Sequence, residues 1–283
     1  MLYGMNLLLW SGEVTEDLLP ICEKLKAMGF DGVEIPMFNL DLDYAKLGKQ
    51  LDDLGLRRTA VTIRNLEDNP ISPDAAVRAK GVELNKKTLD CCAAVGAETL
   101  VGPYHSAIGH FSGAGATADE WQWGVESIRA TAEHAADVGV RMGMEALNRF
   151  ECYFLNCHAD SARFARDVDH PACGIMYDTF HANIEEKSMR DAVLAGGDKL
   201  YHIHISENDR STPGTGGVNW DENFDAIAKS GYDGWLVIEA FGLALPEIAA
   251  ATKIWRKMFD TELKLSEDGL NFMKSEMEKR SGS

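Results

Sequence analysis

The sequence predicts a (β/α)8 barrel, and three observations lead to that fold class. A glycine followed by a short polar step and a β-rich apolar run recurs along the chain, which is typical of a helix that ends at glycine and is followed by a strand. Segments with helical periodicity separate these runs, and the mean repeat of about 35 residues suits a barrel of roughly 250 residues. The alternation continues through all 283 residues without a linker or a shift in composition.

Eight strands are expected in chain order. They are placed at residues 3–10, 29–35, 55–63, 96–102, 139–145, 172–178, 199–205 and 231–239. Helical periodicity between them is clearest over 15–28, 75–95 and 118–138. The alternative, a doubly wound sheet, is disfavoured because no GxGxxG motif follows the first strand.

The C-terminal segment 262–283 is expected to form an extra helix within a single barrel domain that spans residues 1–283. Leu270, Met273 and Met277 recur there at helical spacing. They form an apolar stripe that would pack against the barrel or against a second subunit.

Composition narrows the function classes. Hydrophobic residues make up 45% of the chain and charged residues 26%, which is ordinary for a globular protein. The net charge of −17 would repel nucleic-acid phosphates and anionic lipids, so neither is expected as a partner. The apolar start lacks a basic segment and a cleavage site, and no apolar run is long enough for a membrane span, so a cytoplasmic protein is expected. The six cysteines form no CxxC pair and are expected to be free thiols.

Four polar residues lie at the ends of consecutive predicted strands. Glu145, Asp178 and Glu239 end the fifth, sixth and eighth strands, and His204 lies in the seventh. Strand alternation turns these side chains toward the barrel axis, where burial is costly unless a cation compensates the charge. Three carboxylates and one imidazole form a hard ligand set, so we expect Mn²⁺, with Co²⁺ or Mg²⁺ as possible substitutes.

Other polar residues near the same strand ends are candidates for contact with a substrate or for supporting roles. They are Glu34, His105, His110, Glu151, His181, His202 and Arg210. Arg210 could bind substrate oxygens or simply neutralise nearby acids, and Glu151 has a similar pair of interpretations. His202 lies one layer deeper than His204 and is expected to support it or to fill the core. Glu34 points inward from across the barrel, where it could line a pocket.

Four sequence blocks resemble those of the sugar isomerase/epimerase barrel superfamily. They are "MEALNRFE", "YDTFHANIEE", "HISENDR" and "GYDGWLVIEAF". The blocks are most similar to those of the ketose 3-epimerases, the D-tagatose and D-allulose (psicose) group, and the match covers essentially the whole chain. The resemblance implies Mn²⁺ bound by the same four residues that the strand ends select.

The resemblance also implies substrate contacts and an activity. Glu151, His181 and Arg210 fall on substrate-binding positions, and Phe241 falls where the family has an aromatic wall. The implied reaction is metal-dependent epimerisation of a free ketose at C3 through a cis-enediolate, with Glu145 and Glu239 as the acid/base pair. Because family members are dimers or tetramers, a homodimer or homotetramer is expected.

The chain departs from the epimerase pattern at positions that bear on the substrate. Ser206 stands where the close epimerases have glycine, Asp209 where they have asparagine, and Asn6 where they tend to have an aromatic residue. We expect Asn6 and His105, which lies in the loop after the fourth strand, to contact the sugar. These departures leave open an aldose-ketose isomerase or the lyase subunit of a 3-oxo C-glycoside deglycosidase. A metal-stabilised scaffold is the non-enzyme alternative.

Overall fold

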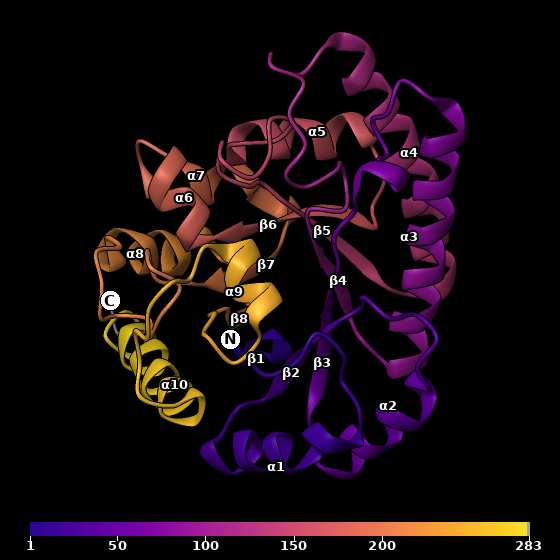
Figure 1. The fold of residues 1–283 in the computed structure, drawn as a ribbon. Helices are drawn as coiled ribbons and strands as arrows, with labels where there is room; N and C mark the ends of the chain where they lie inside the picture. Colours follow the sequence, from indigo (N-terminus) through magenta and orange to yellow (C-terminus); the bar gives the residue numbers. More distant parts are fainter. Residues whose placement is uncertain (282–283) are drawn as a thin grey trace.

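The computed structural model describes residues 1–281 and shows a closed barrel of eight parallel strands (Figure 1). Each strand pairs with its neighbours in chain order, and β1 closes the barrel against β8. The strands are β1 Leu2–Asn6, β2 Gly32–Pro36, β3 Arg57–Val61, β4 Thr99–Gly102, β5 Arg141–Glu145, β6 Cys173–Asp178, β7 Leu200–Ile205 and β8 Trp235–Ile238. The predicted fold class is therefore confirmed.

Helices surround the barrel, and the short α9 lies over one end of it (Figure 1). They are α1 Leu19–Met28, α2 Tyr44–Asp53, α3 Ala75–Val95, α4 Ala118–Val138, α5 His158–Val168, α6 Thr179–Glu185, α7 Met189–Gly196, α8 Trp220–Ser230, α9 Pro246–Thr252 and α10 Glu262–Glu278. Four of them end at a glycine in the left-handed conformation, namely Gly29, Gly96, Gly139 and Gly231. Glycine adopts this conformation without the steric cost of a Cβ, so the recurring glycine does mark helix ends.

The first strand and the first helix are shorter than expected, each for a local reason. The first strand stops at Asn6 because the Asn6 side chain accepts the backbone N–H of Leu8 and starts a 3₁₀ turn over Leu7–Leu9. The helix expected over 15–28 begins at Leu19 after a 3₁₀ turn over Glu16–Leu18. Proline at the start of this helix suits its first turn, where its missing N–H is not needed.

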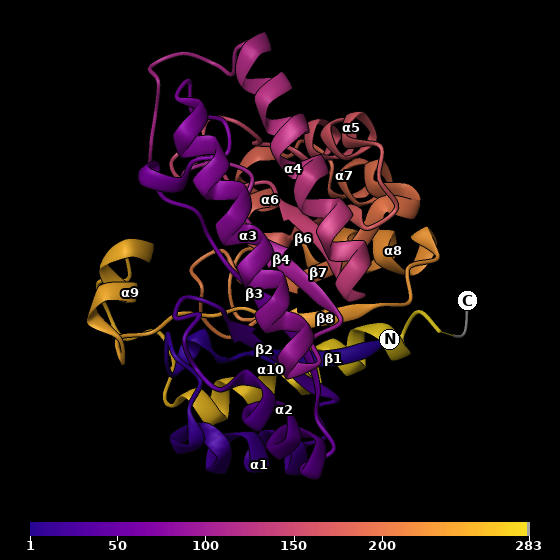
Figure 2. The ribbon, with the colours of Figure 1, turned by 90° about the vertical axis from the view of Figure 1, so that its right-hand side faces the viewer.

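The two segments after β8 have different places in the fold. Helix α10 packs against β8, α8 and α1, with Leu270 and Met273 fully buried, so it completes the ring of helices around the barrel. The short helix α9 lies apart from this ring, beyond the carboxyl ends of the strands (Figure 2). The apolar stripe of the C-terminal helix thus covers the barrel, while α9 is the segment that reaches the barrel mouth.

Because all eight strands are parallel, their carboxyl ends gather at one end of the barrel, where active sites of such barrels are built. Tyr201, Ile203 and Ile205 alternate along β7 with His202 and His204, and both histidines contact Glu34 of β2 across the barrel. Within residues 1–281, no helix combines the length and apolar composition that crossing a membrane requires.

Candidate active site

The structure brings together the four residues that the strand ends select. Glu145 ends β5, Asp178 ends β6, His204 lies in β7 and Glu239 follows β8 by one residue. Each offers one donor atom, and these atoms all lie within 4.8 Å of one another. All four residues are at least 94% buried, so bulk water does little to screen the three acids from each other.

The donor set fits a divalent cation. Nδ1 of His204 is buried without a hydrogen-bond partner among residues 1–281, and it lies 3.7 Å from Oδ2 of Asp178 and 3.5 Å from Oε1 of Glu239. Burial, and then the neighbouring carboxylates of Glu239 and Asp178, raise the pKa of Glu145 well above its ordinary value. A cation among these groups would use the free imidazole nitrogen and compensate the acids. Carboxylate oxygens with one imidazole suit Mn²⁺ or Mg²⁺.

Arg210 lies against this cluster with its backbone in the left-handed conformation, at a φ of 62°. Its Nη1 donates to Glu239 at 2.6 Å, to the hydroxyl of Ser206 at 2.9 Å and to Asp178 at 3.2 Å. The guanidinium carbon also lies 3.7 Å from the centre of the Phe180 ring. The strained backbone and these contacts together hold the Arg210 guanidinium beside the acids, and one of the contacts comes from Ser206.

His181 is placed as a hydrogen-bond donor. The backbone N–H of Asn148 can only donate, and it lies 3.0 Å from Nδ1 of His181, so Nε2 carries the hydrogen of a neutral ring. Burial lowers the pKa of His181, which favours that neutral form. Nε2 lies 3.4 Å from Glu145 and 3.0 Å from Nη2 of Arg210. The amide of Asn148 also donates to Glu151 at 2.8 Å.

A cavity of about 130 Å³ lies over these residues. Its polar lining comes from Glu145, Glu151, His181, Arg210 and Glu239. The remaining lining residues are mainly apolar, and they are Leu8, Phe38, Val61, Ile63, Pro103, Ile108, Leu147, Phe241, Ile248, Ala251 and Thr252. The last three come from α9, so that helix forms one wall. Phe241 also lines the cavity, and its backbone N–H donates to the backbone oxygen of Arg210 at 2.9 Å.

Two residues expected to contact the sugar are absent from this lining. Asn6 is 1% exposed, and its amide donates to Glu34 at 2.9 Å. His105 is fully buried, and its Nε2 lies 2.7 Å from the backbone oxygen of Glu145. These contacts hold both side chains in place, and their contact with a sugar stays a prediction.

Sequence reasoning missed several contributors. The contact of Ser206 with Arg210, the backbone hydrogen bond from Asn148 and the wall formed by α9 were not predicted. Glu34 was considered only as a pocket residue, although it contacts His202 and His204 within the barrel. Its inward position on β2 was the available signal, but alternation alone does not identify a partner on the opposite side of a barrel.

The fold and the site together define a barrel protein with a buried cluster of acids and one histidine that could hold a metal ion, next to a small, partly polar cavity. Over residues 22–275 the chain matches the family described as the xylose isomerase-like TIM barrel, and it belongs to that family.

Known relatives extend the comparison. A D-psicose 3-epimerase of Agrobacterium fabrum is 34% identical over 263 residues, which cover 91% of each protein. An L-ribulose 3-epimerase of Methylomonas sp. is 31% identical over 277 residues, which cover 96% of each. A solved D-allulose 3-epimerase from Methylomonas sp., in complex with D-allulose, has a TM-score of 0.92 at 30% identity over 98% of this chain and 97% of the other. These similarities place the chain among carbohydrate isomerases of the ketose 3-epimerase type.

Proposed function

We propose that the protein epimerises a free ketose at C3 through a cis-enediolate, with Glu145 and Glu239 as the acid/base pair and Mn²⁺ as the cation. The observation that carries the proposal is the position of the two glutamates. They come from the ends of β5 and β8, both line the cavity, and both belong to the buried cluster of donor atoms. The 3-epimerase names of the relatives support the same reaction.

Inversion at C3 requires one group on each face of a planar intermediate. One carboxylate removes the C3 proton, and the other returns a proton to the opposite face. Because β5 and β8 are separated by two strands in the barrel, Glu145 and Glu239 approach the cavity from different directions. In this proposal the pair therefore acts on a substrate held between them.

The cation would be held by Glu145, Asp178, His204 and Glu239, and it would supply a Lewis acid that stabilises negative charge on the substrate oxygens. His181 and Arg210 both line the cavity, with Nε2 of His181 and Nη2 of Arg210 3.0 Å apart. In this proposal both would donate to a substrate oxygen and stabilise the charge that this oxygen gains. Glu151, which also lines the cavity, would accept a hydrogen bond from a substrate hydroxyl.

A panel of free ketopentoses and ketohexoses tests the proposal. The Mn²⁺-loaded protein is incubated with each sugar, and the products are separated by chromatography and identified by NMR. We expect a C3 epimer from at least one ketose. Formation of an aldose without an epimer would indicate an aldose-ketose isomerase. Release of an aglycone from a 3-oxo C-glycoside would indicate the lyase. Either result would contradict the proposed C3 epimerisation.

The same proposal includes Mn²⁺ rather than Mg²⁺ or Co²⁺ as the cation, a homodimer or homotetramer, and a cytoplasmic location. Activity compared across the three metals and light scattering of the purified protein test the first two. Equal activity with all three metals would contradict the choice of Mn²⁺, and a monomeric mass would contradict self-association.

A further inference from the structure

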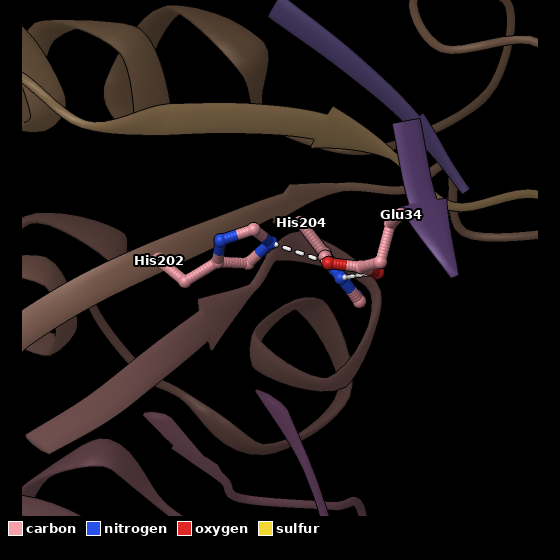
Figure 3. Close-up of side chains that lie close together, drawn as sticks. All are labelled: Glu34, His202 and His204. Atoms are coloured by element: carbon pink, nitrogen blue, oxygen red, sulfur yellow. Dashed lines mark hydrogen bonds and ion pairs between the residues drawn. The ribbon is translucent and has the colours of Figure 1, made fainter. Parts of the chain in front are cut away.

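Glu34 lies inside the barrel beneath the proposed cation site. It is fully buried, and the strand register places it beside Asn6 of β1 and Thr59 of β3. Its side chain extends from β2 toward β7 and meets His202 and His204 (Figure 3). A buried carboxylate at this place is costly unless its oxygens are compensated.

Both oxygens of Glu34 are compensated by groups on two sides of the barrel. Oε1 accepts from the Asn6 amide at 2.9 Å and from Nε2 of His204 at 2.7 Å. Oε2 accepts from the Thr59 hydroxyl at 2.9 Å, and Nε2 of His202 lies 2.9 Å away. The His202 contact is electrostatic, since neither of its ring nitrogens makes a hydrogen bond of good geometry to the described residues. The carboxylate is thus fixed from β1, β3 and β7 together.

This arrangement determines which nitrogen of His204 is available to a metal. The Glu34 carboxylate accepts from Asn6 and from Thr59. It accepts from His204 as well, so Nε2 of His204 carries the hydrogen. Nδ1, on the other side of the ring, then presents its lone pair toward Asp178 and Glu239. We propose that Glu34 is a positioning residue that holds His204 in the orientation and tautomer that bind the divalent cation through Nδ1. The inference rests on the cation site of the proposed function.

A second cation between Glu34, His202 and His204 is the competing interpretation, since their donor atoms also lie within 4.8 Å of one another. That cation would need Nε2 of His204, which already lies at hydrogen-bond distance from Glu34. It would also share the carboxylate with the Asn6 and Thr59 donors. The contacts therefore favour a hydrogen-bonded support, and they predict one cation for each chain.

Direct measurement of Mn²⁺ binding tests the inference. Free Mn²⁺ is followed by its six-line EPR signal as the metal-free protein is titrated, which gives both a dissociation constant and a stoichiometry without any turnover. Loss of an outer partner of a ligating histidine typically weakens metal binding by about 10- to 100-fold. We expect the Mn²⁺ dissociation constant to rise by this factor in Glu34→Gln, which keeps the shape of the side chain. We expect the same for Glu34→Asp, which keeps the charge but is one methylene shorter. Glu34→Asp decides the question if Glu34→Gln does not fold.

Glu276→Gln is the matched control, because Glu276 is a buried acid on α10 that pairs with Lys279 and Arg280 just beyond the end of that helix. The Mn²⁺ dissociation constant of this variant should stay within about twofold of the wild-type value, since these ion pairs involve none of the four cation ligands. Wild-type affinity in folded Glu34→Gln or Glu34→Asp would overturn the inference, as would two Mn²⁺ ions for each wild-type chain. Failure of the wild-type protein to bind Mn²⁺ would instead reject the cation site itself.

Discussion

Ser206 offers a sharp test of how the site is built, because it stands where the epimerase pattern has glycine. Its hydroxyl accepts from Nη1 of Arg210 at 2.9 Å and donates to the backbone oxygen of Glu239 at 2.7 Å. A hydrogen bond to a charged group contributes about 1.5 to 3 kcal/mol. Arg210 keeps its contacts with Asp178 and Glu239 when the hydroxyl is removed, so the lower end of this range applies.

Ser206→Ala should therefore lower kcat/KM by about tenfold, which corresponds to about 1.4 kcal/mol of transition-state stabilisation. Ser206→Gly should lose at least as much, because glycine also adds backbone freedom next to β7. Initial rates of C3 epimerisation with Mn²⁺ provide the measurement. Ser266→Ala, which removes a buried hydroxyl on α10, is the control and should leave kcat/KM unchanged. If kcat/KM of Ser206→Ala stays within about twofold of the wild-type value, the hydroxyl does not position Arg210.

Three further predictions follow from the structure. Glu145→Gln and Glu239→Gln should each abolish turnover while the protein stays folded, as judged by circular dichroism; an active purified variant would reject the acid/base pair. Removal of the metal by EDTA should lower the melting temperature, because a cation at 100 times its dissociation constant stabilises by about 2.7 kcal/mol; an unchanged melting temperature would argue against a site in the folded protein. Gly102→Ala should lower the free energy of unfolding in urea by about 2 to 4 kcal/mol, since at a φ of +116° a Cβ would lie 2.2 Å from the backbone oxygen of Thr62. The control Gly113→Ala, which has a φ of +84° and open space around it, should lower it by about 1 kcal/mol. Equal losses in the two variants would show that the clash at Gly102 is relieved.

The local parts of this fold were predictable from the sequence. The helices expected over 75–95 and 118–138 have these bounds in the structure, because helical periodicity and the flanking cap residues Asp74 and Thr117 act within a few residues. The four clustered polar residues were found because parallel strands end together. Each of these inferences needs only short-range pattern and the fold class.

The missed contacts join residues that are distant in sequence. Glu34 and His204 are 170 residues apart, and their contact depends on the width and stagger of the closed barrel. Asn6 illustrates the same difficulty, since its strand-end position was clear from the sequence but its hydrogen bond to Glu34 was not. The side chains that orient the site were therefore harder to predict than the candidate ligands themselves.

The fate of the C3 hydrogen is the most direct test of the proposed mechanism. The Mn²⁺-loaded protein is incubated with its best ketose in D₂O, and the product is analysed by NMR and mass spectrometry. Two glutamates that act on opposite faces predict a C3 epimer that carries one deuterium atom at C3, because the returned proton comes from a group that exchanges with solvent. An epimer formed without deuterium at C3 would contradict proton transfer by Glu145 and Glu239.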